Sequence, residues 1–315
     1  MDVDTDRVIG HPVKRHWYAS RDLAPGPATV RDTTVQDVIA QVFTDDELTD
    51  LGGGNGLNLL SPRSRQVLRV HKPYVSRCRL IGERRLRGWL ADQGLLVARP
   101  VDQPMLRCGP RWAEVEEFVP TTGESLTSPT LFAAIGALHR SLKRYSCELP
   151  RPMDATFASP GTLLRWHQTN LRDGYSEADG ELTGLLRRLN RQWVPVTSLP
   201  RQLIHGDTHR DNIRMAADGR PVYFDFGAAT TGPRVFDLSY ALAHLVTTGG
   251  YDLDRSTGLV EAYQDAAHSP LSPAETGALF PFAAAVALYY EVCGWMPGQP
   301  WRQSADRLLT EHYRR

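Results

Sequence analysis

The first third of the chain switches between two spacings of apolar residues. From Thr33 to Phe43 apolar side chains recur every three or four residues, which predicts a short amphipathic helix, and residues 76–93 repeat that spacing. Short segments rich in apolar residues at 66–70 and 112–118 predict β-strands. Ahead of them, two apolar segments flank the glycine cluster 52–56, which is typical of a β-hairpin. We therefore expect a small sheet with accompanying helices.

Beyond residue 123, apolar positions follow a helical spacing almost throughout. The segments with this spacing are 129–145, 163–193, 235–246, 255–266 and 273–295. Between the two regions, residues 119–123 contain proline, threonine and glycine and break the pattern. We place a boundary between two lobes there. The expected fold class is α+β, with a sheet in the first lobe and mostly helices in the second.

The charge balance narrows the range of partners. The 315 residues include 36 Lys and Arg against 36 Asp and Glu, so the formal net charge is zero. A neutral chain has no overall field that attracts nucleic acid or an anionic membrane, and it argues mildly against a polycationic acceptor. No apolar run reaches the roughly 18 residues of a membrane span, and the acidic start, Met1–Asp6, does not fit a secretory signal. We expect a cytoplasmic protein that binds neither nucleic acid nor membrane.

The most informative pattern combines a polar loop with an acidic turn. An apolar pair leads into the segment 205–212, which reads His-Gly-Asp-Thr-His-Arg-Asp-Asn. Residues 220–224 are expected to form a buried strand that ends at Asp225 and a Phe-Gly pair, after a hairpin turn at Asp218-Gly219. Carboxylates at the ends of apolar strands are costly unless they are paired or bind a metal. The joint pattern therefore indicates chemistry rather than a solvated turn.

These residues place two acids and an amide where a kinase needs them. Asp207 can orient and deprotonate an acceptor hydroxyl, whereas Asn212 and Asp225 can supply hard oxygen ligands to the Mg²⁺ that holds nucleotide phosphates. We assign these three residues as catalytic candidates, and the last two also as metal ligands. His205 and His209 are expected to organise the loop. The implied cofactors are ATP and Mg²⁺.

The pattern His-Gly-Asp-x-His-x-x-Asn resembles the catalytic loop of the aminoglycoside phosphotransferase and choline kinase-like family, which shares the protein-kinase fold. Asp225-Phe226-Gly227 matches its metal-binding motif, and Gly232-Pro233 and Asp237-Leu238-Ser239 match its continuation. The resemblance extends from about Leu48 to the C-terminus and is strongest at 203–242. It implies a bilobal protein-kinase-like fold with a small antiparallel-sheet N-lobe and a mostly helical C-lobe.

On this basis we divide the chain into three parts. Residues 1–45 form an N-terminal extension and helix, residues 46–119 a nucleotide-binding N-lobe, and residues 120–315 a C-lobe with the catalytic loop and the acceptor site. A helical insertion at about 160–193 is expected beside the cleft. The resemblance also implies that Asp237 supports the catalytic loop by hydrogen bonding, with a simple helix N-cap as the alternative.

The glycine hairpin is a candidate for holding nucleotide phosphates, because glycine lets backbone N–H groups approach phosphate oxygens closely. The residues assigned to this role are Gly53, Gly54, Asn55, Gly56 and Asn58. The chain departs from a typical kinase at Arg69, where a lysine usually stands and pairs with a glutamate of the next helix. We expect Arg69 to pair with Glu83 and to contact phosphate, which a guanidinium can do bidentately. A surface salt bridge is the alternative.

The family resemblance also suggests where adenine binds and what the protein phosphorylates. Backbone groups at Glu117, Phe118 and Val119 are expected to bind adenine at the hinge between the lobes. The expected acceptor is a hydroxyl of a small metabolite or antibiotic, in a pocket between the insertion and the C-terminal helices. The candidate pocket residues are Asp252, Asp254, Glu261, Glu291 and Trp295.

Two alternatives stay open. The acceptor could be Ser or Thr of a precursor peptide, in which case residues 1–45 would bind a leader segment or a partner protein. The chain could instead be a nucleotide-binding pseudokinase that acts through a partner, which Arg69 favours and which Asp207, Asn212 and Asp225 oppose. The sequence distinguishes neither ATP from GTP nor a role in antibiotic resistance from one in natural-product biosynthesis.

Overall fold

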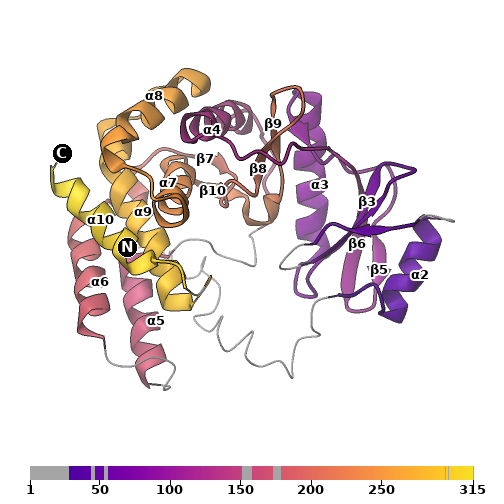
Figure 1. Ribbon diagram of the computed structural model, residues 1–315, viewed down its shortest axis with the longest axis horizontal. Helices are drawn as coiled ribbons and strands as arrows, with labels where there is room; N and C mark the ends of the chain where they lie inside the picture. The colour runs from indigo at the N-terminus through magenta and orange to yellow at the C-terminus, as the bar shows by residue number, and fades with distance from the viewer. Residues whose placement is uncertain are drawn as a thin grey trace.

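The computed structural model describes residues 28–43, 47–52, 56–150, 158–172, 179–294, 296 and 298–314. The main sheet lies at one end of the molecule and most helices at the other (Figure 1). The predicted α+β organisation, a small antiparallel sheet followed by a mostly helical part, is confirmed. Of the predicted N-terminal extension, residues 1–27 lie outside the described residues.

A five-stranded antiparallel sheet forms the first lobe, in the order β1-β2-β3-β6-β5. Its strands are β1 (Thr49–Asp50), β2 (Leu57–Ser61), β3 (Gln66–Val70), β5 (Leu106–Cys108) and β6 (Arg111–Glu117). Helix α2 (Thr33–Val42) packs Val35 and Val38 into the same apolar core as Leu59 and Leu68. The predicted first helix, the strands at 66–70 and 112–118 and the pairing of the two hairpin strands are confirmed.

Helix α3 (Arg77–Asp92) follows β3 and is confirmed close to its predicted bounds. Ser76 caps its start by accepting a hydrogen bond from the backbone N–H of Arg79, and Gly94 follows its end at φ +83°. The helix buries apolar residues and also three long charged ones, Arg79, Glu83 and Arg87. Such side chains are rarely buried unless they are paired, and their partners lie at the candidate site.

Two short sheets support the polar loop and the acidic turn. Their strands are β4 (Leu96–Val97), β7 (Arg201–Ile204), β8 (Ile213–Met215), β9 (Pro221–Tyr223) and β10 (Thr230–Pro233). Strands β8 and β9 form an antiparallel hairpin whose predicted turn is confirmed, with Gly219 at φ +80°. Strand β4 pairs with β9 in parallel. A strand that precedes the lobe boundary in the sequence is thereby hydrogen-bonded to the hairpin of the second lobe.

The second lobe is built from helices around α9. The helices are α4 (Ser128–Leu142), α5 (Pro160–Arg172), α6 (Gly180–Gln192), α7 (Val235–Gly249), α8 (Ser256–Ala267), α9 (Pro273–Cys293) and α10 (Trp301–Arg314). Short 3₁₀ turns are η2 (Val196–Ser198), η3 (Phe226–Ala228) and η4 (Leu253–Arg255). We did not predict α10. It packs against α9, as do α7 and the two insertion helices α5 and α6 (Figure 1).

Helix α9 is long and apolar enough to cross a membrane by length and composition alone, although no continuous apolar run suggested a span. However, 72% of its apolar window is buried inside the protein. Its apolar character is therefore that of a helix at the centre of a packed core.

Candidate functional site

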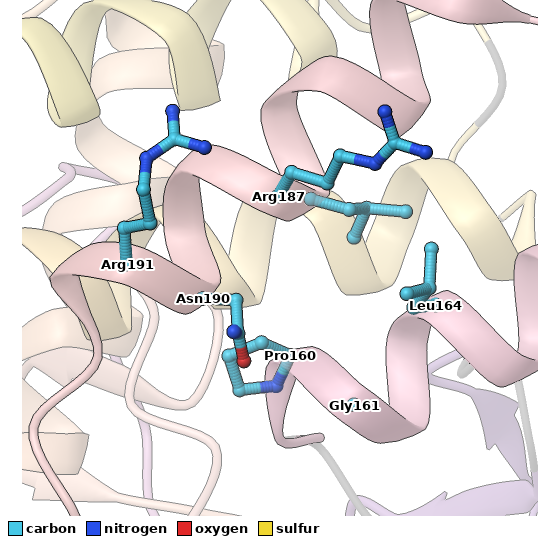
Figure 2. A pocket seen from close by; sticks show the side chains of 7 residues that line it. Pro160, Gly161, Leu164, Arg187, Asn190 and Arg191 are labelled. Carbon is cyan, nitrogen blue, oxygen red and sulfur yellow. The ribbon is translucent and has the colours of Figure 1, made fainter.

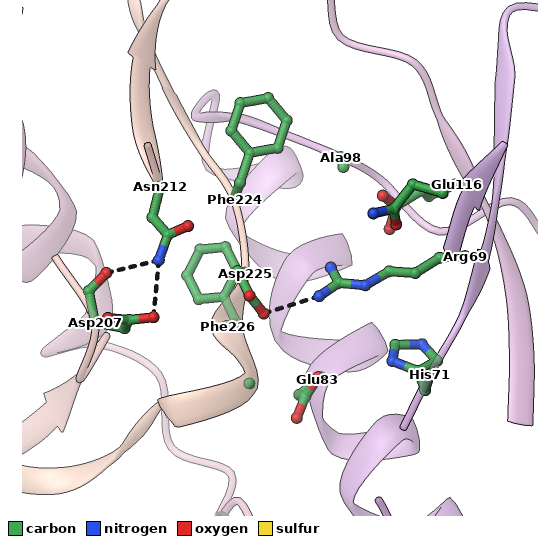
Figure 3. Close-up of polar contacts among 12 residues, drawn as sticks. Arg69, His71, Glu83, Ala98, Glu116, Asp207, Asn212, Phe224, Asp225 and Phe226 are labelled. Atoms are coloured by element: carbon green, nitrogen blue, oxygen red, sulfur yellow. Dashed lines mark hydrogen bonds and ion pairs between the residues drawn. The ribbon is translucent and has the colours of Figure 1, made fainter. Parts of the chain in front are cut away.

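Asp207 and Asn212 are held together in the loop between β7 and β8. The side-chain amide of Asn212 donates to the backbone carbonyl and to Oδ2 of Asp207, both at 2.9 Å (Figure 3). The Asn212 carbonyl accepts from the N–H of Phe224 at 2.8 Å, which joins the loop to the strand that leads to Asp225. The Asp207 side chain is 22% exposed, so its carboxylate can still meet a second molecule.

Asp225 follows β9 in a left-handed backbone conformation, φ +51° and ψ +69°, which is uncommon for a residue other than glycine. Its Oδ1 lies 2.8 Å from Nη2 of Arg69, so the contact crosses between the lobes (Figure 3). Burial alone would raise the pKa of Asp225, but the charge and hydrogen bond of Arg69 outweigh it and hold that pKa below its ordinary value. Against the effect of burial, Asp225 in turn raises the pKa of Arg69. Both groups therefore stay ionised.

Asp237 is fully buried in the first turn of α7 and fixes the loop from behind. Its carboxylate accepts from the backbone N–H groups of His205 and Gly206, and from Nε2 of His139, each at 2.8 Å. Burying a carboxylate is tolerable only with such partners. The expected support of the loop by Asp237 is confirmed. Its carboxylate hydrogen-bonds to the loop and does not act as the N-cap of the helix.

Gly206 and His205 set the distance between the loop and the turn after Asp225. Gly206 has φ +82°, and a Cβ at this position would lie 2.4 Å from the carbonyl oxygen of Ala228, so only glycine fits. Nε2 of His205 donates to the Phe224 carbonyl at 2.8 Å, while its Nδ1 accepts from the Asp207 N–H at 3.3 Å. With both ring nitrogens used in this way, His205 organises the loop, as expected.

An Asp237→Asn variant is expected to lose about 2–4 kcal/mol of unfolding free energy, because its amide group would face a backbone donor that the carboxylate now satisfies. Urea unfolding followed by circular dichroism measures the change. Ser239→Ala is the matched control, since Ser239 is equally buried on α7 but donates only to the Leu279 carbonyl. We expect about 1 kcal/mol for that loss. Equal effects of the two substitutions would contradict the anchoring role of Asp237.

The predicted pair of Arg69 with Glu83 is wrong. Glu83 instead accepts from Nε of Arg79, one turn earlier on α3, at 2.6 Å. This partner is four residues away on the same helix, so the contact forms without bringing other elements together. Arg69 extends from β3 to Asp225 instead (Figure 3).

A buried cluster of charges lies beside Arg69 in the first lobe. Glu114 faces Arg69 across the β3–β6 pairing, and it accepts from Arg87 at 2.6 Å and pairs with His71 at 2.9 Å. Arg87 also pairs with Glu116. Burial would raise the pKa of Glu114, but Arg87 and His71 outweigh it and lower that pKa. The negative charge of Glu116 and Glu114 adds to that of Asp225 in raising the pKa of Arg69.

The predicted glycine hairpin is described only in part, because Gly53, Gly54 and Asn55 lie outside the described residues. Gly56 packs on β3, where a Cβ would come within 2.9 Å of the Val70 carbonyl oxygen. Asn58 donates from Nδ2 to the Gly52 carbonyl at 2.8 Å, which ties the two sides of the hairpin together. Binding of phosphate by this hairpin stays a prediction.

Two backbone amides of the predicted hinge are already used within the protein. The N–H of Glu117 donates to the Arg99 carbonyl at 2.8 Å, and that of Phe118 donates to the Arg65 carbonyl at 2.9 Å. An adenine ring would therefore have to use other groups of this segment. The predicted contacts of Glu117, Phe118 and Val119 with adenine stay a prediction.

The residues expected to hold a metal have suitable oxygen atoms. Because Nδ2 of Asn212 donates to Asp207, its amide oxygen is turned away from that carboxylate (Figure 3). Asp225 uses Oδ1 for Arg69, which leaves Oδ2 as a second carboxylate oxygen. An amide oxygen and a carboxylate are hard ligands of the kind that Mg²⁺ prefers. The donor set thus fits Mg²⁺ bound together with phosphate oxygens.

The model of a known protein family, described as the phosphotransferase enzyme family, matches residues 58–280 and so includes the loop, the turn and Arg69. The chain belongs to this phosphotransferase family. The predicted resemblance is thereby confirmed, and the predicted enzyme class is confirmed as a phosphotransferase. No curated protein sequence matches the chain closely enough to count as a relative.

Solved structures similar to this phosphotransferase share its fold at low sequence identity. An amicoumacin kinase solved with AMP-PNP, Ca²⁺ and Ami is 16% identical, with 88% of this chain and 92% of that chain covered and a TM-score of 0.62. A choline/ethanolamine kinase family protein from Mesorhizobium loti is 15% identical, with 89% and 94% covered and a TM-score of 0.60. A choline kinase from Streptococcus pneumoniae is 14% identical, with 88% and 98% covered and a TM-score of 0.58. These likenesses confirm the protein-kinase-like fold class.

Two of the hollows that described residues line lie in the helical lobe of the phosphotransferase. Asp252 and Asp254, two of the predicted acceptor-pocket residues, line a hollow of about 270 Å³ together with side chains of α10. A second hollow, of about 290 Å³, lies between α5 and α6, where Arg187 and Arg191 border an apolar floor (Figure 2). Asp207 lines neither hollow.

The other predicted acceptor-pocket residues are placed differently. Glu291 lies on α9 and pairs with Arg302 at 2.8 Å, and Glu261 is exposed on α8. Trp295 lies outside the described residues. The position of the acceptor pocket therefore stays a prediction.

Aromatic side chains around Asp207 were not predicted. The hydroxyl groups of Tyr240 and Tyr290 hydrogen-bond at 2.5 Å, and burial together with the charge of Asp207 raises the pKa of each. Nε2 of His209 lies 3.6 Å from Oδ1 of Asp207, and its ring stacks on that of His244 at 5.1 Å. Burial and the charge of His209 lower the pKa of His244 to about 3. Tyr240 and His244 are four residues apart on α7, so they lie on the same face of the helix. This spacing is the sequence signal from which the group of aromatic side chains could have been predicted.

Proposed function

We propose that this chain transfers the γ-phosphoryl group of ATP, with Mg²⁺, to a hydroxyl of a small molecule. The observation that carries the proposal is the direct bonding of Asn212 to Asp207, on the same hairpin unit that ends at Asp225. Phosphoryl transfer needs aligned reactants and neutralised charge rather than much covalent chemistry from the protein. The partly exposed carboxylate of Asp207 can align the acceptor, and the nearby oxygens of Asn212 and Asp225 can hold a metal that neutralises phosphate charge.

Asp207 is proposed as the group that orients the acceptor and takes its proton. The acceptor oxygen forms a bond to the γ-phosphorus as the bond from that phosphorus to the bridging oxygen breaks, and ADP leaves. The proton of the acceptor hydroxyl passes to the carboxylate of Asp207. Asn212 fixes the position of that carboxylate, and Asp237 fixes the loop that bears it.

Asn212 and Asp225 are proposed to hold Mg²⁺, which when bound neutralises charge on the phosphate oxygens. Arg69 is proposed to contact phosphate, where its fork of donors suits a bidentate contact. In the protein alone this guanidinium pairs with Asp225. With nucleotide and metal bound, Arg69 would contact phosphate and Asp225 would hold the metal, in place of their pair with each other.

The acceptor is proposed to be an alcohol-bearing metabolite or antibiotic. The structures with the same fold include kinases named for amicoumacin, choline and aminopropanol, which are small molecules. The peptide alternative depends on residues 1–45, of which the structure describes residues 28–43. No observation on the described residues favours it.

A nucleotide-binding pseudokinase is the second candidate, because Arg69 occupies an oxygen of the residue expected to bind metal. The two candidates differ in turnover. A coupled assay for ADP formation, with ATP, Mg²⁺ and a panel of small amino alcohols and antibiotics, tests them. The kinase predicts acceptor-dependent ADP formation and a phosphorylated product by mass spectrometry. Metal-dependent nucleotide binding without turnover on any acceptor would favour the pseudokinase.

A further inference from the structure

The side chain of Arg79, on α3, joins three parts of the molecule. It is 2% exposed, and Nε donates to Oε1 of Glu83 at 2.6 Å. Nη2 donates to the carbonyl groups of Phe226 at 2.9 Å and Gly227 at 3.2 Å, and Nη1 donates to the Pro150 carbonyl. Every nitrogen of the guanidinium is thus engaged, and two of the acceptors directly follow Asp225.

The turn that receives these bonds needs support from outside. Asp225 adopts a left-handed conformation, which costs energy for a residue with a side chain and persists where its surroundings hold it. Within the turn, the Phe226 carbonyl also accepts from the N–H of Ala229 at 3.0 Å. Arg79 adds a charge-assisted bond to that same oxygen, and such bonds are stronger than neutral ones.

We propose that Arg79, oriented by Glu83, is a positioning residue that sets the backbone of the turn at Phe226 and Gly227 and thereby the placement of Asp225 for metal. The inference rests on the proposed function, because it assigns a role in metal binding. It also gives Glu83 a different task from the one expected of it. Glu83 on α3 orients Arg79 toward the turn. It does not pair with Arg69, whose partner is Asp225.

Arg79→Lys is the informative substitution, since lysine keeps the charge but loses the planar fork that reaches several carbonyls at once. Arg84→Lys is the matched control. Arg84 lies on the same helix, donates from Nη2 to the carbonyls of Val101 and Gln103, and pairs with Glu114, but it does not touch the turn. Both variants weaken contacts of α3, but only Arg79→Lys removes contacts to the turn. A comparison of the two therefore isolates the effect on the turn.

The first readout is hydrogen exchange of the Ala229 amide in the protein without metal or nucleotide. In Arg79→Lys we expect roughly tenfold faster exchange, which corresponds to the loss of one or two hydrogen bonds to the turn. In Arg84→Lys we expect the wild-type rate. Equal rates in wild type and Arg79→Lys, or equal acceleration in both variants, would overturn the proposal.

The second readout is calorimetric titration of a nonhydrolysable ATP analogue with and without Mg²⁺. The gain in affinity due to Mg²⁺ should shrink about tenfold in Arg79→Lys and stay at the wild-type value in Arg84→Lys. If wild type shows the gain and Arg79→Lys keeps it, this inference fails and the proposed function stands. If wild type shows no gain, the proposed function fails, and this inference with it.

Glu83→Ala keeps the proposal falsifiable if Arg79→Lys does not fold. This change removes the acceptor for Nε of Arg79 but leaves the arginine in place. Exchange of the Ala229 amide should be faster than in wild type, but by less than the tenfold expected for Arg79→Lys, because the arginine is still present. An unchanged rate would show that Glu83 does not orient Arg79.

Discussion

An Asp207→Asn variant is expected to lose about 10²–10⁴-fold in kcat, the usual contribution of a group that takes a proton in the transition state. Asparagine has nearly the same shape, and its carbonyl oxygen can still accept the hydrogen bond from Nδ2 of Asn212. It cannot accept the proton of the acceptor hydroxyl. Since Asp207 is assigned to the acceptor and not to the nucleotide, the KM for ATP should change little.

Steady-state kinetics at saturating acceptor measure this effect, and Asp211→Asn is the matched control. Asp211 belongs to the same loop, but its side chain is 82% exposed and its contact is a 3.6 Å approach to Nδ1 of His209. Its replacement should leave kcat close to wild type. A kcat for Asp207→Asn within the range of this control would remove Asp207 from the chemistry and require another proton acceptor.

An Asp225→Asn variant is expected to lose roughly 10²–10³-fold in turnover, a loss typical of removing one charge-stabilising group from a transition state. The substitution removes the carboxylate charge assigned to metal and to Arg69. Protein atoms surround Asp225 closely enough to affect its pKa, but 46% of its side-chain surface is still exposed to solvent. Ion pairs that solvent can reach in this way contribute about 1 kcal/mol or less to folding. The variant should therefore fold normally, so that its lost activity reports on the site.

Turnover as a function of Mg²⁺ concentration, together with a thermal melt, measures both parts of this expectation. Asp218→Asn is the matched control, because Asp218 also pairs with an arginine at 2.8 Å and lies on the same hairpin, at its exposed turn. It should keep wild-type turnover and metal dependence. Full activity with unchanged metal dependence in Asp225→Asn would contradict the assignment of Asp225 as a metal ligand.

Local features of the site were predictable because they are encoded in adjacent residues. The hairpin turn at Asp218-Gly219 follows from turn chemistry, and the loop at 205–212 is recognisable as a pattern. The family pattern predicts that Asp237 supports the loop by hydrogen bonding, and the structure identifies the backbone N–H groups of His205 and Gly206 as the donors. These features depend on short stretches of sequence and little on how distant elements pack.

Contacts across long sequence separations were not predictable in the same way. The pair of Arg69 with Asp225 joins residues 156 positions apart and depends on how the two lobes approach each other. The expected partner of Arg69, Glu83, is closer in sequence. However, Arg79 lies four residues from Glu83 on the same helix and is the arginine that pairs with it. An i, i+4 Arg–Glu pair is visible in the sequence, whereas the carbonyl groups that Arg79 also reaches are not.

Helix α10 shows a different limit. Its burial of Trp301 against Tyr290, with ring centroids 4.3 Å apart, depends on α9 being in place. A polar terminal segment gives a weak signal on its own, because in proteins most of the stability of a short helix comes from tertiary packing.

Calorimetric titration of wild-type protein with a nonhydrolysable ATP analogue, with and without Mg²⁺, tests most directly whether the loop and turn form a metal-dependent nucleotide site. We expect saturable binding that Mg²⁺ strengthens by about tenfold or more, with that gain lost in Asp225→Ala. The exchange of Arg69 from Asp225 to phosphate would accompany this binding. An absence of binding, or binding that is the same with and without Mg²⁺, would show that the loop and turn do not form a metal-dependent nucleotide site.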